Sequence, residues 1–327
     1  MAAPAHSRIL ITGGTGFVGA WLVEGLRARF GGATDIFVAA PTVEAVSNAE
    51  MVRLDLLARD NVEEVVRRLQ PTACIHLAGV THVVGSAKAP GTTWGVNLRG
   101  TMQLAESLMD LAPACRLIHV SSGEVYGLTA NRRERLDEDA PLNPANLYAV
   151  TKAAADLAIG EMALRGLRAI RFRPFNHTGP GQSPDFVVPG VAAQVARAEA
   201  AEAPAAIRIG ATDRARDFMD VRDVCAAYVA AVERFDALPN GVAMNLASGH
   251  ARTIQSVLDD LLALARRSIE VQVDETRIRP NDVVRICGDA DLARRLLDWV
   301  PATPWRETLA EVLGYWRART AAEAAVS

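Results

Sequence analysis

Two side chains at helical spacing are the first candidates for chemistry in this sequence. Tyr148 and Lys152 stand four residues apart in PANLYAVTKAAADLA, where strong helix formers follow Pro144, so both side chains fall on one face of the predicted helix. A tyrosine with an ordinary pKa of about 10 is a poor acid–base catalyst near neutrality, and a nearby lysine ammonium lowers that pKa. The pair predicts proton transfer to or from a substrate oxygen.

A hydroxyl group is available at the end of a predicted strand. The apolar run of residues 116–121 reads as a buried strand, and it ends in Ser121 and Ser122. Ligands collect at the carboxyl edge of parallel sheets, so either serine could donate a hydrogen bond to a substrate carbonyl beside the tyrosine. His76 and His119 lie inside apolar strands, and we interpret them as packed core residues.

A glycine-rich turn predicts where a cofactor lies. TGGTGFVG, residues 12–19, joins a predicted strand at 8–12 to a helix in which apolar residues recur every four positions. Glycines at this spacing permit a tight turn, let the backbone approach a pyrophosphate and leave helix N–H groups to bind it. The turn predicts dinucleotide binding by Gly13, Gly16, Phe17, Val18 and Gly19.

The end of the second predicted strand leaves the choice of cofactor open. A carboxylate there would accept the adenosine ribose hydroxyls of NAD, but the chain reads Ala39-Ala40-Pro41. No arginine suited to the 2′-phosphate of NADP stands at this point either, so NAD and NADP both remain possible. Asp55, after the third strand, is a candidate to meet the adenine, and a helix N-cap is the alternative reading of it.

The elements around these residues predict a doubly wound α/β fold. Short apolar runs alternate with helix-period segments, which is typical of a parallel Rossmann sheet with crossover helices. Beyond Pro174 the elements become shorter and richer in proline and glycine. We expect a dinucleotide-binding Rossmann domain at 1–173, to which 218–246 returns, and a smaller mixed α/β substrate domain at 174–217 and 247–320. We expect the last residues, 321–327, to fray.

Composition excludes several classes of protein. Half of the 327 residues are hydrophobic, 22% are charged and the formal net charge is −3, so we predict a globular protein without a nucleic-acid surface. No apolar run is long enough to span a membrane, and the chain begins without a secretory signal. The four cysteines are far apart and lie mostly in apolar runs, which predicts reduced core thiols, no metal site and a cytoplasmic protein.

Taken together, the motifs resemble the extended short-chain dehydrogenase/reductase family. The resemblance is carried by TGGTGFVG, by HLAG at 76–79, by SSGEVYG at 121–127 and by the Tyr148–Lys152 pair. It implies that Tyr148 is the acid–base residue, that Lys152 also holds the nicotinamide ribose, that Ser122 assists and that Asn97 helps to place the lysine. The cofactor residues that the resemblance implies beyond the glycine turn are Asp55, Leu56, Leu77, Ala78, Gly79, Asn97, Tyr148 and Lys152.

The second half is similar to the GDP-4-keto-6-deoxy-D-mannose reductases, which form GDP-D-rhamnose. RPFNHTGPGQ, RDFMDVRD, RIRPND and the TIQSVLDDLLALA helix carry this similarity. It implies a GDP-linked sugar as ligand and a homodimer. Arginine forks match phosphate oxygens, so Arg216 and Arg279 are candidates for the diphosphate. The full set of expected substrate contacts is Ser122, Glu124, Asn176, Val188, Arg216, Arg279 and Asp282.

Two other functions stay open from the sequence. GDP-mannose 4,6-dehydratases also resemble this chain, but they usually place an Asp, Ser or Thr where Gly123 stands, and after their Asn-His they read differently from Thr178-Gly179-Pro180. A dehydratase or an epimerase would use tightly bound NAD(P) and consume none. A non-catalytic nucleotide-sensing protein would keep the fold without the chemistry, and the intact Ser122, Tyr148 and Lys152 argue against it.

Overall fold

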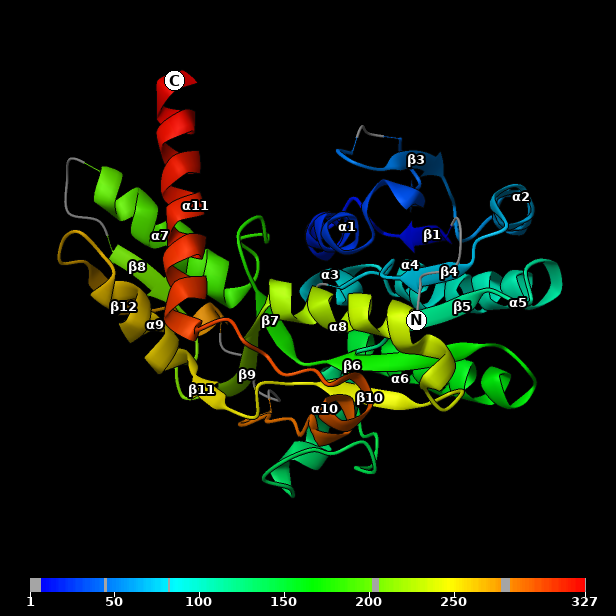
Figure 1. Cartoon of the computed structure of the whole chain (residues 1–327). Coiled ribbons are helices and arrows are strands. Elements are labelled where there is room, and N and C mark those ends of the chain that lie inside the picture. The colour runs from blue at the N-terminus through cyan, green and yellow to red at the C-terminus, as the bar shows by residue number, and fades with distance from the viewer. Residues whose placement is uncertain (1–6, 44–45, 82, 202–205, 278–282, 327) are drawn as a thin grey trace.

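A seven-stranded parallel sheet forms the centre of the larger lobe (Figure 1). The computed structural model describes residues 7–43, 46–81, 83–201, 206–277 and 283–326. All neighbouring strands of this sheet pair in parallel. In spatial order the strands are β10 (Ala243–Leu246), β6 (Ala169–Pro174), β5 (Arg116–Val120), β4 (Ala73–His76), β1 (Ser7–Thr12), β2 (Thr34–Ala40) and β3 (Glu50–Arg53).

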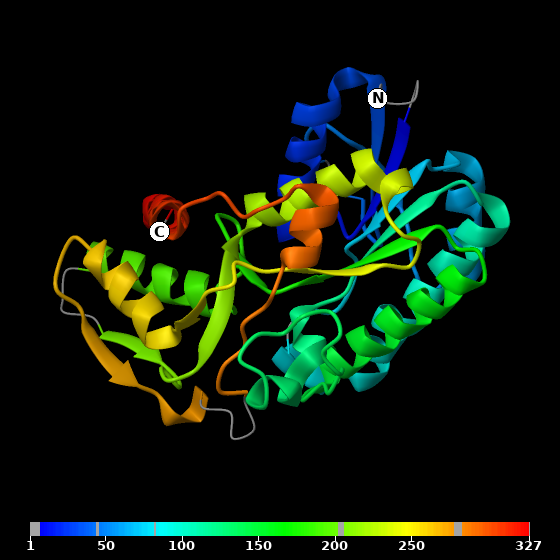
Figure 2. The ribbon, with the colours of Figure 1, turned by 60° about the horizontal axis from the view of Figure 1, so that its bottom comes forward.

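Helices cover both faces of this sheet (Figure 2), so its strands are apolar on both sides. The first layer packs Leu22 and Leu26 into one core cluster, and the second packs Val62 and Leu104 into another. The first layer consists of α1 (Phe17–Phe30), α8 (Val221–Arg234) and α10 (Asp291–Leu297). The second consists of α2 (Arg59–Leu69), α5 (Thr101–Leu111) and α6 (Leu147–Leu164). The predicted doubly wound α/β class is confirmed.

Short helical segments complete the larger lobe. They include a π-helical turn at η2 and a 3-10 segment at η3, both of which carry candidate site residues. Their bounds are η1 (Gly31–Ala33), α3 (Val83–Lys88), α4 (Pro90–Trp94), η2 (Gly95–Gly100), η3 (Gly123–Asn131) and η4 (Phe235–Ala237).

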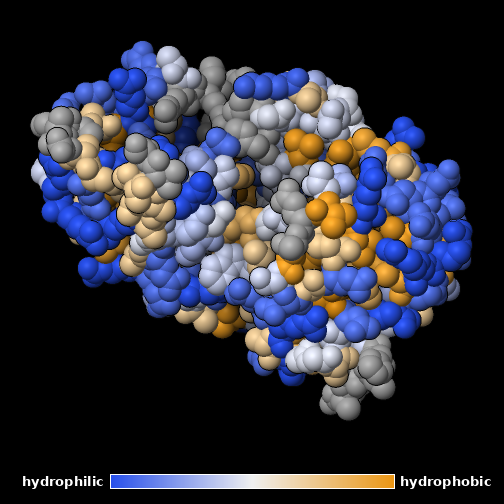
Figure 3. Space-filling view, turned by 90° about the horizontal axis from the view of Figure 1, so that it is seen from above, coloured by the Kyte–Doolittle hydropathy of each residue, from blue (hydrophilic) through white to orange (hydrophobic). Residues whose placement is uncertain are grey.

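A smaller lobe has a core of its own, in which Val191, Leu258 and Leu313 are buried. One of its sheets has three strands, β11 (Ala251–Thr253), β9 (Ala215–Asp220) and β7 (Asn176–Thr178), and the other pairs β12 (Glu270–Val273) with β8 (Ala206–Ile209). Its helices are α7 (Val187–Ala200), α9 (Ile254–Ala263), η5 (Glu275–Arg277) and α11 (Trp305–Val326). A recess separates the two lobes on the face shown in Figure 3, where hydrophobic residues gather on the larger lobe.

The structure corrects the expectation for the C-terminus. Residues 321–326 continue α11 instead of fraying. Alanine is the strongest helix former, and an Arg319–Glu323 ion pair one turn apart supports this end of the helix. The other predicted elements differ from the observed ones by one or a few residues at their ends. Among the described residues, no helix combines the length and apolarity needed to cross a bilayer.

Candidate active site

The glycine turn between β1 and α1 is shaped for close approach of a ligand. Gly13 has φ +69°, and a Cβ there would lie 2.7 Å from the backbone of Ala78. A Cβ on Gly19 would lie 2.2 Å from the carbonyl oxygen of Gly14, so only glycine lets α1 pack on the turn. The N-cap is Gly16, which has no side chain to bond the first amides of α1. These amides suit a pyrophosphate, so the residues present fit a dinucleotide.

The loop after β4 is bonded to this turn. Leu77 and Ala78 donate their backbone N–H groups to the carbonyl oxygen (3.1 Å) and the hydroxyl (3.4 Å) of Thr12. A Cβ on Gly79 would lie 3.1 Å from Asn97 Oδ1 and 3.7 Å from Lys152 Nζ. These contacts bring three separate parts of the sequence together at one edge of the sheet, namely Leu77 to Gly79, Asn97 and Lys152.

Asn97 joins this loop to the helix that carries Lys152. Its Oδ1 accepts from the N–H of Val80 at 2.7 Å, and its Nδ2 donates to Val80 O at 3.1 Å and to Thr151 Oγ1 at 3.0 Å. The Thr151 hydroxyl donates to the carbonyl oxygen of Tyr148 at 2.8 Å. Asn97 thus braces the turn of α6 between Tyr148 and Lys152, and it does so through Thr151.

The loop after β3 contains Asp55, which we expected to meet the adenine, and Leu56, another expected cofactor residue. Asp55 is exposed, and its carboxylate accepts the N–H of Leu57 at 2.9 Å. The N-cap of α2 is Ala58, so the alternative reading of Asp55 as a helix cap is wrong. Leu56 is buried, and its carbonyl oxygen accepts a hydrogen bond from Gln103 Nε2 at 2.7 Å. The Asp55 carboxylate lies at the sheet edge with one oxygen used by its own turn.

Ser122, Tyr148 and Lys152 meet where β5 ends against the start of α6. The Asn146 side chain caps α6 by accepting the N–H of Ala149 at 2.9 Å, which fixes the first turn of the helix. Lys152 is 4% exposed, and its Nζ donates to Val120 O at 2.6 Å. The Ser122 hydroxyl accepts the N–H of Glu124 at 3.2 Å and lies near enough to Tyr148 to act on the pKa of its phenol.

Burial shifts both ionisable groups of this set. It raises the pKa of Tyr148 to about 12; the Ser122 hydrogen bond opposes that shift and the Glu124 carboxylate adds to it. Burial lowers the pKa of Lys152 to about 8, against the Asp156 carboxylate. The predicted lowering of the tyrosine pKa by the lysine is wrong for the protein alone, because the ammonium is bonded to a strand carbonyl and desolvation of the phenolate dominates.

The expected sugar contacts lie on the strands of the smaller lobe and near Ser122. Asn176 begins β7, which pairs with β9, and Glu124 is half-buried in η3. Arg216, on β9, is 9% exposed and donates from Nη1 to Ala215 O and Val283 O, both at 2.9 Å. The side chain of Val188 is buried in α7, so its backbone is what it can offer a ligand. Arg279 and Asp282 lie outside the described residues.

The segment between β6 and α7, which includes the short strand β7, lies on the cofactor turn. The His177 ring packs parallel to Phe17 with 6.4 Å between centroids, and its Nδ1 donates to Phe175 O at 3.0 Å. Trp21 Nε1 donates to Pro180 O at 3.1 Å. These contacts tie the segment, and with it the smaller lobe, to the N-terminus of α1. His76 and His119 are fully buried, as expected of core residues.

Sequence reasoning missed a buried charged cluster behind the site. Arg171 and Arg173 of β6 both bond Asp156, which lies on α6 one helical turn after Lys152. The available signals were a carboxylate four residues after Lys152 and two arginines alternating inside an apolar strand.

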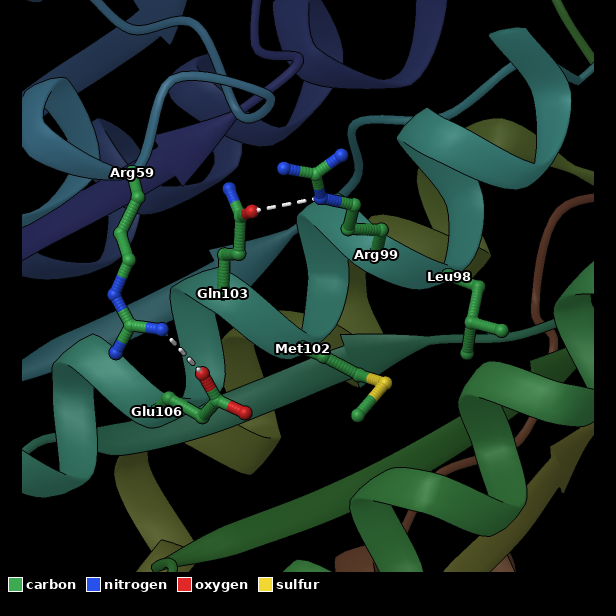
Figure 4. A pocket seen from close by; sticks show the side chains of 6 residues that line it. All are labelled: Arg59, Leu98, Arg99, Met102, Gln103 and Glu106. Carbon is green, nitrogen blue, oxygen red and sulfur yellow. Dashed lines mark hydrogen bonds and ion pairs between the residues drawn. The ribbon is translucent and has the colours of Figure 1, made fainter. Parts of the chain in front are cut away.

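A cavity of about 430 Å³ lies apart from the site, on the outer side of α5 (Figure 4). None of the predicted site residues lines it. Figure 4 shows Gln103 bonded to Arg99 and Arg59 bonded to Glu106 beside two apolar side chains, Leu98 and Met102.

The fold and the site define a nicotinamide-dependent nucleotide-sugar oxidoreductase of the extended short-chain dehydrogenase/reductase type. The chain belongs to the GDP-mannose 4,6 dehydratase family, whose model matches residues 10–312.

Two characterised relatives act on GDP-linked sugars by their names. The chain is 32% identical to the GDP-6-deoxy-D-mannose reductase of Pseudomonas aeruginosa, over 97% of this chain and 99% of that protein. It is 27% identical to the GDP-6-deoxy-D-talose 4-dehydrogenase of Aggregatibacter actinomycetemcomitans, over 86% and 88%.

Solved structures of relatives contain nicotinamide cofactors. RMD from Pseudomonas aeruginosa, complexed with NADPH, superposes with a TM-score of 0.81 at 30% identity, over 96% of this chain and 100% of that one. The UDP-glucose 4-epimerase of Thermus thermophilus, complexed with NAD, gives a TM-score of 0.82 at 26% identity, over 95% and 99%.

Proposed function

We propose that this protein uses NADPH or NADH to reduce the C4 keto group of GDP-4-keto-6-deoxy-D-mannose, forming GDP-D-rhamnose or its C4 epimer. The reductase from Pseudomonas aeruginosa, matched over nearly its whole length, and the talose 4-dehydrogenase support chemistry at C4 of a GDP-6-deoxyhexose.

The packing around Gly123 is the observation that favours a reductase over a dehydratase. A Cβ on Gly123 would lie 2.9 Å from ring carbons of Phe175, which is 3% exposed. The hydroxyl or carboxyl side chain expected here in dehydratases would therefore collide with a buried ring. Position 123 therefore lacks the acidic or hydroxyl side chain that dehydratases usually place before the glutamate, which disfavours elimination.

The bound reduced nicotinamide would supply hydride. Tyr148 would then give its proton to the developing alkoxide at C4, and the Ser122 hydroxyl would hydrogen-bond the same oxygen. Lys152, as an ammonium, would hold the nicotinamide ribose and stabilise the tyrosinate left behind. Asn97 would keep the α6 turn in place through Thr151.

We assign sugar-nucleotide binding to the smaller lobe, with residues 174–217 and 247–320 as the substrate part and 1–173 plus 218–246 as the cofactor part. Within 247–320, α10 is the exception, because it packs on the sheet of the larger lobe. Arg216 would bond a phosphate oxygen, Asn176 would meet the sugar or a phosphate, and Val188 would offer its backbone N–H. Arg279 and Asp282 remain our candidates for the second phosphate and the ribose.

The decisive experiment supplies GDP-4-keto-6-deoxy-D-mannose together with NADPH or NADH and identifies the product by NMR. We expect one reduced cofactor to be consumed for each sugar alcohol formed. Conversion of GDP-mannose without net cofactor consumption would instead establish the dehydratase, and interconversion of C4 epimers without consumption would establish the epimerase. Tight cofactor binding with no turnover of any of these sugars would leave the nucleotide-sensing protein.

We also propose a homodimer formed through α6 and its neighbour α5. Leu157 and Leu164 lie seven residues apart on α6 and are 59% and 89% exposed, an unusual state for leucine side chains on one helical face. A double Leu157→Glu, Leu164→Glu variant should elute as a monomer in size-exclusion chromatography with light scattering. A monomeric wild-type protein would contradict the proposal.

The four cysteines are buried and unpaired, which supports a reducing compartment such as the cytoplasm.

A further inference from the structure

Asp156 is a fully buried carboxylate held by two arginines. It lies on α6, one helical turn after Lys152, and is 0% exposed. Arg173 donates from Nε to Oδ2 at 2.9 Å and from Nη2 to Oδ1 at 3.1 Å, and Arg171 donates from Nη1 to Oδ1 at 2.8 Å. Both carboxylate oxygens are therefore bonded to guanidinium groups of β6.

Lys152 stays separate from this ion cluster although it is one turn away. Its Nζ donates to Val120 O at 2.6 Å, on β5. A carboxylate without arginine partners would compete for that ammonium, because opposite charges attract strongly in a buried site. The two arginines keep Asp156 bonded toward β6, and the ammonium remains at the carboxyl edge of the sheet.

Asp156 supplies the negative charge that acts on Lys152, and the other titratable groups near the lysine include two histidines. From β4 and β5 come His76 and His119, and burial lowers the pKa of His76 to about 3 and that of His119 well below its usual value. Both rings are therefore neutral at neutral pH. Burial opposes ionisation of Asp156, but the bonds from Arg173 keep the pKa of this carboxyl below its usual value.

Arg173 extends the cluster to the segment that carries Ser122. Its Nη1 donates to the hydroxyl of Tyr126 at 3.0 Å and to Glu138 O at 3.2 Å, and Tyr126, in η3, donates to Asn245 Oδ1 at 2.7 Å. One guanidinium thus fixes α6 and η3 relative to β6.

We propose that Asp156 is a positioning residue for Lys152: its negative charge favours the ammonium form, while Arg171 and Arg173 prevent it from pairing with that ammonium. The proposal rests on the role of Lys152 in holding the nicotinamide ribose within the proposed function. It assigns this cluster a part in cofactor binding.

The test measures NADPH affinity against pH by cofactor fluorescence, with no sugar present. In the wild-type protein affinity should fall as pH rises past about 8, where Lys152 loses its proton. Asp156→Asn removes the charge that raises the lysine pKa, so its fall should begin about one pH unit lower. Arg171→Gln removes an opposing positive charge and keeps the Arg173–Asp156 pair, so its fall should begin at a higher pH.

The opposite signs separate this role from simple damage to the fold. The control is Glu199→Gln, which breaks a partly buried ion pair to Arg317 (2.7 Å) between α7 and α11 and should leave the profile in place. If Asp156→Asn does not fold, the upward shift of Arg171→Gln still tests the proposal. It is overturned if Arg171→Gln shifts the profile downward or leaves it unmoved, or if the wild-type profile is flat. Because no sugar is used, a failure of the reductase assignment would not alter this result.

Discussion

Replacing Tyr148 by phenylalanine tests the proposed chemistry most directly. The change removes one hydroxyl and keeps a half-buried ring, while the Asn146 cap and the Thr151 bond that fix this turn of α6 remain. Loss of a positioned general acid lowers turnover by about 10²–10⁴-fold. This corresponds to about 3–5 kcal/mol of lost transition-state stabilisation.

The assay follows oxidation of NADPH in a single turnover with GDP-4-keto-6-deoxy-D-mannose, with NADPH affinity measured separately by fluorescence. The glycine turn lies outside the change, so affinity should stay within about threefold of the wild type, a difference of under ~1 kcal/mol. Ser122→Ala is a companion variant, which should lose less because it removes only one donor to the developing alkoxide. A Tyr148→Phe protein that turns over at close to the wild-type rate would refute the assignment of Tyr148 as the proton donor.

Three further variants test other parts of the structure. Gly19→Ala should lose most NADPH affinity in a fluorescence titration, because its Cβ would lie 2.2 Å from Gly14 O and push α1 from the turn. NADPH should bind more tightly than NADH, because the strand end at Ala40 lacks the carboxylate that favours NAD, and exposed Arg53 is paired in register with Ala40. Arg53→Ala should therefore reduce the difference between the two Kd values. Asp217→Ala should lower the free energy of unfolding, measured in urea, by about 3 kcal/mol, because the N–H groups of Ser248, Gly249 and Gly288 would lose their hydrogen-bond acceptor.

Local patterns were sufficient to predict the sheet and the cofactor turn. The strand at 8–12, the glycines at 13, 16 and 19 and the helix after them are contiguous, so one stretch of sequence contains the whole signal. The Tyr148–Lys152 spacing likewise needs only a helix. The return of 243–246 to the sheet was also readable, as an apolar strand after a long apolar helix.

Properties that depend on pairing between distant segments were not predictable. The bonds from Arg171 and Arg173 to Asp156 exist because β6 packs under α6, and no local pattern contains that distance. The prediction that Lys152 lowers the pKa of Tyr148 was wrong for the same reason. Spacing gives the lysine four residues away, but the desolvation of the phenol and the bond from Lys152 to Val120 O come from the tertiary fold.

One continuous stretch of chain, residues 173–177, connects three requirements of the site. Arg173 anchors the helix of Tyr148 and Lys152, Phe175 covers Gly123 beside Ser122, and Asn176 begins the strand that leads into the smaller lobe. His177 then packs on Phe17 at the cofactor turn. Because these contacts follow one another without a break, a shift of this stretch would displace the catalytic helix, the hydroxyl pair and the sugar contact together. This explains why the chain changes from β6 to the short strand β7 at Phe175. It must contact α6, η3 and α1 within a few residues, and one unbroken helix or strand would turn successive side chains away from one or more of them.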